Sequence, residues 1–221
     1  MTRTGWRRNA SAAPAPPELV RSVGELAVSL LSDCMTRATG ALGIRPWHGG
    51  GSMAGTAVTV RTRSGDNLAI YAALRICRPG DVLVVDGGGA LDQALMGEIM
   101  TTYAEHAGLA GVVLDGAIRD VDAIGAREFP VYARGVTHRG PYKDGPGEVN
   151  VPVSIGGLVV VPGDIVVGDG DGVLAVRVDE AADLVIRARA KAESEARSLA
   201  AIAAGTYDLS WVDEQEARRR D

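Results

Sequence analysis

The chain has 221 residues, of which 46% are hydrophobic, and its formal net charge is −5 at pH 7. That length suffices for one domain with a substantial core, and 29 glycines beside a single phenylalanine are typical of a turn-rich α/β fold. The acidic balance argues against nucleic acid and anionic membranes as partners.

No apolar run is long enough to span a bilayer, and the first residues lack the apolar core of a secretion signal. We therefore expect a soluble cytoplasmic protein. Cys34 and Cys77 are too few for a disulfide framework or a zinc site, so both are expected to be buried free thiols.

The sequence divides into three parts. Residues 1–17 mix arginine with alanine and proline without periodicity, which predicts a disordered N-terminal arm. Residues 18–205 alternate apolar segments with turn signals and form one predicted domain. Residues 206–221 end in the charged string ARRRD and are predicted to be a fraying C-terminal tail.

The predicted domain opens with a helix and a loop. From Glu18, apolar residues recur at helical spacing, which predicts one amphipathic helix that ends before Gly40. A glycine-rich loop is predicted over residues 44–55. Its Trp47 and His48 allow a functional interpretation, although a lone histidine in such a loop is more often a surface group.

The next elements alternate between strand and helix. Residues 56–63 alternate polar with β-branched side chains, which predicts a strand. Asp66 is expected to cap a helix that runs to Cys77. Residues 81–85 and 111–114 are continuously apolar after their first residue, as expected for strands that are covered on both faces.

These two apolar strands end in polar sequences that could meet in space. The first is followed by DGGG, beginning at Asp86, and the second by DGAIRD. Because parallel strands present their carboxyl ends at the same edge of a sheet, where loops line a crevice, we expect Glu98, Arg119 and Asp120 to share a pocket.

Gly97 interrupts a stretch of otherwise helical polarity, and two interpretations remain open. A glycine inside a helix costs about 1 kcal/mol relative to alanine, which favours Gly97 as the start of a new helix. The amides of Glu98, Ile99 and Met100 would then point outward unpaired and form an anion site for a small carboxylate or phosphate. Alternatively, one helix runs over residues 91–106 and tolerates the glycine.

The middle of the chain continues the α/β pattern. A short helix is predicted to begin at Asp120 or Asp122, and a strand follows over residues 131–136. Residues 138–150 form a predicted stiff loop, whose prolines and glycines hold Lys143 in place. Taken alone, a lysine in a loop is usually just solvated.

The last part of the domain is predicted to add a second layer. Residues 151–178 carry short strands separated by glycine-containing turns, which predicts a second sheet layer of antiparallel character. Residues 179–204 are predicted to form a long closing helix. Its apolar positions are Ala182, Val185, Ile186 and Ala190.

Several kinds of catalysis are excluded for the predicted pocket, because the sequence lacks the motifs that they require. No Ser/His/Asp set, no catalytic Cys/His pair and no phosphate-binding fingerprint is present. Arg119 beside Asp120 could be a structural ion pair. Joined to Glu98 and a helix start, however, the pair is a more specific sign of a functional site. Asp120 could hold a hard divalent cation through one carboxylate and waters, and Arg119 could pair with the oxygens of a 2-oxo acid.

Three long segments resemble the RraA-like family: GDNLAIYAALRICRPGDVLVVDGGG, GEIMTTYAEHAGLAGVVLDGAIRD and RGPYKDGPGEVNVPVSIGGLVVVPGDIVVGDGDGVLAV. This family includes class II 4-hydroxy-4-methyl-2-oxoglutarate and 4-carboxy-4-hydroxy-2-oxoadipate aldolases and the regulator of ribonuclease E activity. The resemblance covers roughly residues 19–205. It implies a swivelling-domain αββα sandwich, assembled as a homotrimer or homohexamer with active sites between subunits.

The resemblance also implies roles for individual residues. A Mg²⁺ or Mn²⁺ ion would be bound chiefly through Asp120 and waters. Arg119 would contact the pyruvate moiety of the substrate, and the amides of Glu98, Ile99 and Met100 after Gly97 would hold its carboxylate.

Three further residues match family positions. Glu98 would order metal-bound water, Lys143 would lie near the substrate, and Glu195 is the best match for an acid from the neighbouring subunit, with Glu193 as the alternative. The chain departs from the aldolase pattern at Ala123, where an acid is common, although Asp122 lies beside it.

We therefore expect a metal-dependent retro-aldol lyase that releases pyruvate from a 4-hydroxy-2-oxo acid and also decarboxylates oxaloacetate. Two alternatives remain open. One is a non-catalytic regulator that binds a ribonuclease or another protein partner. The other is a related lyase that acts on a different 2-oxo acid.

Overall fold

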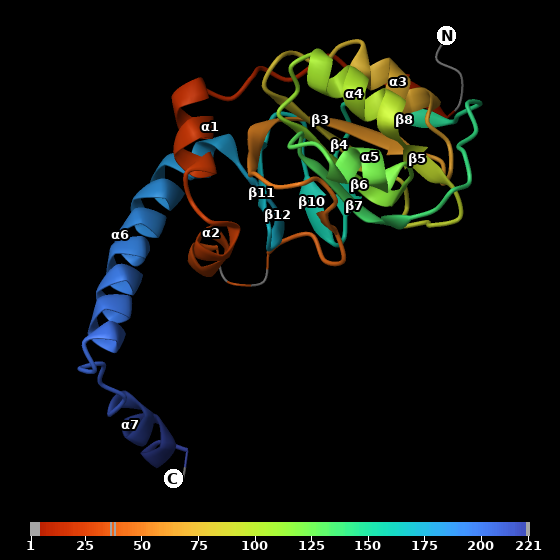
Figure 1. The fold of residues 1–221 in the computed structure, drawn as a ribbon. Coiled ribbons are helices and arrows are strands. Elements are labelled where there is room, and N and C mark those ends of the chain that lie inside the picture. Colours follow the sequence, from red (N-terminus) through yellow and green to blue (C-terminus); the bar gives the residue numbers. More distant parts are fainter. Residues whose placement is uncertain (1–4, 36, 38, 220–221) are drawn as a thin grey trace.

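The computed structural model describes residues 5–35, 37 and 39–219. Its sheet runs in the order β1-β8-β3-β4-β6-β7-β2, with β11 and β12 joined through β3, and β5 beside β6 (Figure 1). The strands on this path are β1 (Trp6–Arg8), β2 (Arg45–Pro46), β3 (Met53–Thr62), β4 (Asp81–Asp86), β6 (Gly111–Ile118), β7 (Val131–Val136) and β8 (Gly147–Val149).

The remaining strands and the helices complete the domain. The other strands are β5 (Ala94–Met96), β9 (Val153–Ile155), β10 (Leu158–Val160), β11 (Ile165–Asp169) and β12 (Gly172–Val176). The helices are α1 (Pro17–Gly24), α2 (Val28–Cys34), α3 (Leu68–Leu74), α4 (Glu98–His106), α5 (Val121–Gly125), α6 (Val178–Ala203) and α7 (Trp211–Ala217). None of the described helices is long and apolar enough to cross a membrane.

Side-chain alternation along the strands separates the core into layers. In β4, Leu83 and Val85 pack with α3 and α4, whereas Val82 and Val84 pack toward β9 to β12. In β11, Val166 faces that same inner layer, whereas Ile165 and Val167 pack against α1, α2 and α6. The order helices, strands, strands, helices is the αββα sandwich that the resemblance implies.

Strand β3 joins the two strand layers. Its first residues pair antiparallel with β11, from Met53 opposite Gly168 to Thr56 opposite Ile165. Its later residues pair with β4 and β8 instead. The predicted antiparallel second layer is therefore present, but only β9 and β10 form a separate sheet.

Several expectations need correction. The predicted helix over residues 18–39 is two helices, because the chain turns after α1 and the Asp169 carboxylate accepts the Val28 amide at 2.9 Å where α2 starts. The strand predicted from residue 56 begins earlier, at Met53, within the predicted glycine-rich loop. Cys34 and Cys77 are free, as expected, but half-buried rather than buried. Another concerns the amino-terminal segment.

The segment expected to be a disordered arm is attached to the sheet over residues 5–9 and again at Ala15, whose amide donates to Thr56 Oγ1 at 3.0 Å; residues 1–4 lie outside the described part. Strand β1 pairs in parallel with β8, and the Trp6 side chain packs against the core. Asn9 and Asn150 exchange side-chain hydrogen bonds with each other's backbone carbonyls at 2.9 and 3.3 Å. The pairing is too short to produce a sequence period.

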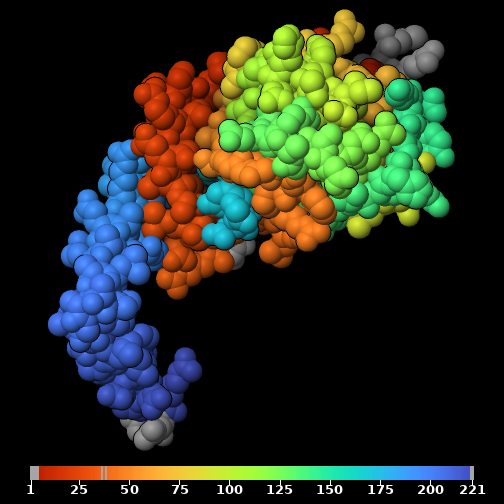
Figure 2. Space-filling model, in the orientation of Figure 1, coloured from red at the N-terminus to blue at the C-terminus, as the bar shows by residue number. Residues whose placement is uncertain are grey.

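Helix α6 is present as predicted, but its buried face differs. Ala181, Leu184, Val185 and Ala188 are buried, whereas Ile186 is 69% exposed, because the helix packs on α1 and α2 through the other positions. The carboxyl-terminal half of α6 and the following α7 project away from the body of the domain (Figures 1 and 2).

Candidate functional site

The carboxyl end of β6 and the short strand β5 build the site. Strand β5 pairs in parallel with the end of β6, with Ala94 opposite Ala117, and the Arg119 amide donates to the Met96 carbonyl at 3.1 Å. This pairing places Gly97 against Arg119 and Asp120, although 22 residues separate Gly97 from Arg119 in the chain. The expected convergence at the strand end is therefore present for these residues.

Gly97 precedes a helix, which decides between the two interpretations. Helix α4 begins at Glu98, and residues 94–96 are a strand, so no helix runs continuously over residues 91–106. The Glu98 amide is not unpaired, however, because it donates to Asp120 Oδ2 at 3.0 Å. The expected three-amide anion site is thus reduced by one donor.

Two glycines leave room for the Arg119 side chain, one on each side of it. A Cβ atom added at Gly97 would clash with Asp120 Oδ2 and lie 2.8 Å from Arg119 Cγ, and one at Gly140 would lie 3.2 Å from Arg119 Nη1. Gly97 has φ −149°, an extended conformation that other residues adopt, so close approach rather than backbone freedom requires the glycine. Arg119 Nε also lies 3.5 Å from Asp120 Oδ2.

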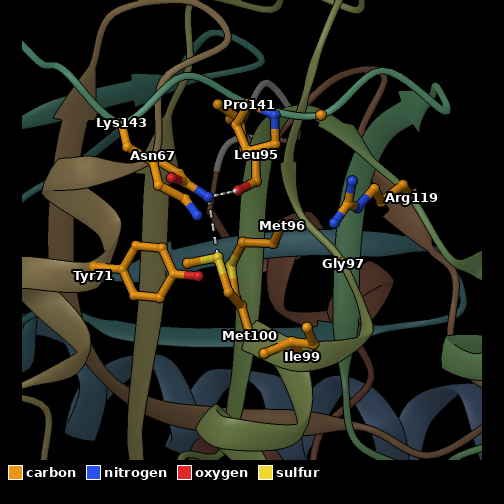
Figure 3. Close-up of a pocket in the computed structure, with 11 residues that line it drawn as sticks. Asn67, Tyr71, Leu95, Met96, Gly97, Ile99, Met100, Arg119, Pro141 and Lys143 are labelled. Atoms are coloured by element: carbon orange, nitrogen blue, oxygen red, sulfur yellow. Dashed lines mark hydrogen bonds between the residues drawn. The ribbon is translucent and has the colours of Figure 1, made fainter.

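A pocket opens in front of Arg119. In Figure 3, Arg119 lies on one side, Lys143 and Tyr71 lie on the opposite side, and Ile99 and Met100 form part of the wall. Among the described residues, the lining contains these two cations and no acid. The pocket therefore favours an anionic ligand.

Lys143 reaches the pocket from the loop between β7 and β8. Its Nζ atom lies 5.8 Å from the centre of the Tyr71 ring, within the range of a cation–π interaction. The side chain is exposed and lies across the pocket from Arg119 (Figure 3).

The sequence interpretation missed Asn67 and Tyr71. Asn67 is 2% exposed, and its Nδ2 donates to the Leu95 carbonyl at 3.1 Å and to Met100 Sδ at 3.2 Å (Figure 3). Its Oδ1 has no hydrogen-bond partner among the described residues, although it is buried and the residue lines the pocket. Asn67 and Tyr71 are four residues apart at the start of a helix, which places them on the same face, and this spacing was the signal in the sequence that could have found them.

Two expected site residues lie elsewhere in the single chain. Glu195 is on the projecting half of α6, where it forms an ion pair with Lys191 at 3.0 Å, and Glu193 is exposed on the same half. Neither lines the pocket. Arg119 and Asp120 line a second hollow together with Asp122 and Ala123. Of the three residues expected to share a pocket, only Arg119 therefore lines the pocket of Lys143, and Glu98 lines neither hollow.

The surroundings of Asp120 fit a cation that keeps most of its water. Within the described part of the chain, no three His, Cys, Asp or Glu side chains converge as a metal cage would require. Asp120 has φ 60° in the left-handed region and a side chain that is 41% exposed, and Glu98 begins the helix beside it. One accessible carboxylate with a second acid nearby suits Mg²⁺ or Mn²⁺ better than a metal that needs several protein ligands.

Comparison with known proteins adds to this geometry. Residues 28–175 match the family model described as "RraA-like: Aldolase/RraA". A Halalkalibacterium halodurans protein named "Putative 4-hydroxy-4-methyl-2-oxoglutarate aldolase" is 39% identical over 181 residues, which cover 81% of this chain and 85% of that protein.

Solved structures show the same fold. An uncharacterized protein from Pseudomonas syringae pv. tomato is similar with a TM-score of 0.78 and 30% identity, covering 88% of this chain and 96% of that one. Streptomyces coelicolor RraAS2, described as an unusual member of the RNase ES inhibitor RraA protein family, has a TM-score of 0.77 and 29% identity, covering 85% of this chain and 98% of its own.

Proposed function

The chain belongs to the RraA-like family, and on that premise we propose that it is a lyase that cleaves a 4-hydroxy-2-oxo acid into pyruvate and a second carbonyl compound. The name of the H. halodurans relative supports an aldolase. The observation that carries the proposal is the position of Arg119, which faces the pocket between Gly97 and Gly140 instead of the protein interior.

The charges of the pocket suit such a substrate. A 2-oxo acid presents its carboxylate and oxo oxygens side by side in a plane, which matches the donors of a guanidinium. Arg119 is therefore the proposed contact for the pyruvate moiety, assisted by the Ile99 and Met100 amides at the start of α4. Lys143, on the opposite side, would neutralise a negative group at the far end of the substrate.

The proposed reaction breaks the bond between C3 and C4 of the substrate. Glu98 takes the proton of the C4 hydroxyl through one water, and the C4 oxygen becomes a carbonyl as the bonding electron pair moves to C3 and the 2-oxo oxygen. Arg119 stabilises the resulting enolate, which then takes a proton at C3 to give pyruvate. The proton removed at the start balances the one added at the end.

Asp120 is the proposed ligand of a divalent cation. Bound Mg²⁺ or Mn²⁺ would supply positive charge that polarises the 2-oxo group. Decarboxylation of oxaloacetate passes through the same enolate, so we propose it as a side activity.

We further propose that the chain acts as a homotrimer or homohexamer in which a second copy brings Glu195 to the pocket. The exposed position of Glu195 on a projecting helix supports this arrangement. Mixing inactive Arg119→Ala and Glu195→Ala chains, refolded together, would restore part of the activity if sites are shared. Mixtures that stay as inactive as their components would contradict shared sites.

A pyruvate-release assay tests the function directly. The purified protein is given oxaloacetate and several 4-hydroxy-2-oxo acids with Mg²⁺, with excess chelator, and as Arg119→Ala. We expect turnover only with metal and with Arg119 present. Arg21→Ala is the matched control, because Arg21 is exposed on α1 and outside the pocket. Turnover that persists in excess chelator, or in Arg119→Ala, would exclude the mechanism.

A non-catalytic regulator is the second candidate, favoured by the similarity to RraAS2. A regulator would bind a ribonuclease or another protein through its surface and would release no pyruvate from any substrate. The same assay, combined with a pull-down of ribonuclease, therefore separates the two functions.

A further inference from the structure

Asp66 is a fully buried carboxylate directly before the pocket residue Asn67, with 0% of its surface exposed. It does not line the pocket. Nothing in the proposed reaction uses it. We propose that Asp66 is the positioning residue that fixes the Lys143 loop at the pocket.

Both carboxylate oxygens of Asp66 accept backbone hydrogen bonds. Oδ2 accepts the amides of Asp144 at 2.7 Å and Gly145 at 2.9 Å, and Oδ1 accepts the amide of Leu68 at 2.9 Å. One side chain thus joins the start of α3, which carries Tyr71, to the loop that carries Lys143. Hydrogen bonds to an ionised acceptor are about twice as strong as neutral ones, so this connection is strong.

The charge of Asp66 is compensated from the solvent side. Arg63 Nη2 lies 3.1 Å from Asp66 Oδ2, and Arg63 is itself 45% exposed. Burying a carboxylate without partners would cost folding free energy. The two loop amides and Arg63, which all contact Oδ2, offset that cost.

The backbone of Lys143 is held on both sides. Before it, the Tyr142 amide donates to the Gly65 carbonyl at 2.8 Å, and the Tyr142 carbonyl accepts the Asn67 amide at 3.0 Å. After it, the Asp144 amide is held by Asp66. A lysine side chain has many rotamers, so fixing its backbone is the available way to keep its ammonium group over the pocket.

Hydrogen exchange measures this role without reference to catalysis. Asp66→Ala removes both acceptor oxygens, and Asp66→Asn removes the charge and one acceptor. We expect the amides of residues 142–147 to exchange about 10-fold faster or more in Asp66→Ala, and less so in Asp66→Asn. Asp81→Ala is the matched control, because Asp81 is also buried and accepts one backbone amide, from Arg78, at 2.7 Å.

The wild-type protein gives a second measurement if Asp66→Ala does not fold. The amides of Asp144 and Gly145 should exchange more slowly than those of Gly50 and Gly51, which lie in the exposed glycine-rich loop. Equal exchange in the two loops would overturn the inference.

A double-mutant cycle distinguishes positioning from general destabilisation; this measurement rests on the proposed function. If Asp66 acts through Lys143, Asp66→Asn should reduce kcat/KM in the wild type but add almost nothing to Lys143→Ala. Losses that multiply would overturn the inference. A wild-type protein without lyase activity would instead reject the proposed function and leave the exchange measurement to decide the role of Asp66.

Discussion

The Asp120 carboxylate accepts the backbone amide of Glu98 at 3.0 Å, so a residue that follows β6 caps the helix that follows β5. This contact fixes the Asp120 carboxylate relative to the Glu98 backbone. Any change that separates them should affect chemistry before it affects the fold.

Gly97→Ala tests the close packing at this contact. A methyl group there would meet Asp120 and Arg119, and we expect kcat/KM to fall by about 100-fold, the effect of roughly 1 Å of misplacement. The circular dichroism spectrum should not change. Gly170→Ala is the control, because no atom lies within 4 Å of the added Cβ at that position. A Gly97→Ala enzyme with normal activity would mean that Arg119 and Asp120 need not lie where the structure places them.

Glu98→Gln separates the two proposed activities. Retro-aldol cleavage requires removal of a hydroxyl proton, and we expect it to slow by about 100-fold or more without the carboxylate. Oxaloacetate has no C4 hydroxyl, so its decarboxylation should be affected much less. The measurement is pyruvate release from both substrates by the same preparation. Equal losses on the two substrates would remove Glu98 from the proton transfer.

Tyr132→Phe should stabilise the protein. The Tyr132 side chain is fully buried, and its hydroxyl has no hydrogen-bond partner among the described residues. Burial, and then the charge of Asp169, raise the pKa of Tyr132, so the hydroxyl stays neutral. We expect the free energy of unfolding in urea to rise by about 1 kcal/mol. A loss of similar size would show that the hydroxyl has a partner.

Cys77 should resist alkylation in the folded protein. Burial, and secondly the charge of Asp81, raise the pKa of its thiol from 9.0 to about 12, which lowers the thiolate fraction about 1,000-fold. Iodoacetamide at pH 8 should modify Cys77 in the Cys34→Ser variant only after denaturant is added. Rapid modification of the native variant would contradict the raised pKa.

The same shift predicts a pH dependence of stability. The unfolded thiol ionises above about pH 9 while the folded thiol stays protonated to about pH 12, so the unfolded state binds fewer protons in that range. The free energy of unfolding should therefore fall as the pH rises from 9 to 12. Cys77→Ala should reduce this slope.

Trp6→Ala should loosen the amino-terminal attachment. Trp6 packs against the core next to Gly145, and β1 is held to the sheet by pairing with β8 alone. We expect a loss of about 2 kcal/mol in the free energy of unfolding, because the side chain is only partly buried. Arg8→Ala, on the exposed part of the same strand, should have almost no effect. Equal melting temperatures for the two variants would mean that Trp6 contributes no packing.

The fold was predictable where local pattern decides it. Strands β4 and β6 and helix α6 follow from apolar runs and turn residues that lie within a short window, whereas the sequence left open whether a helix starts at Gly97. Strand β5 and the break between α1 and α2 were not predictable, because they depend on distant partners: Ile118 opposite Met96, and Asp169 capping Val28. A sequence window contains neither partner.

The site shows the same division. Gly97, Glu98, Arg119 and Asp120 lie together because a strand end and a helix start adjoin; the strand end was predicted from the sequence, and the helix start was one of two open interpretations. Asn67 and Tyr71 were missed because the periodic apolar residues of their helix reveal its buried face, and no pattern marks the residues that face the pocket. Glu195 lies apart from them on α6, where it pairs with Lys191.

The main path of the sheet ends in two short strands, β1 and β2, while the long apolar strands β3, β4, β6 and β7 lie between them. Strand β1 carries Arg7 and Arg8, and β2 consists of Arg45 and Pro46. Each of these end strands is therefore short and positively charged, and Pro46 has no backbone N–H to donate. Such borders offer little template for another sheet. These two borders should accordingly resist edge-to-edge aggregation in a crowded cell, even though they flank valine-rich strands of high β-propensity.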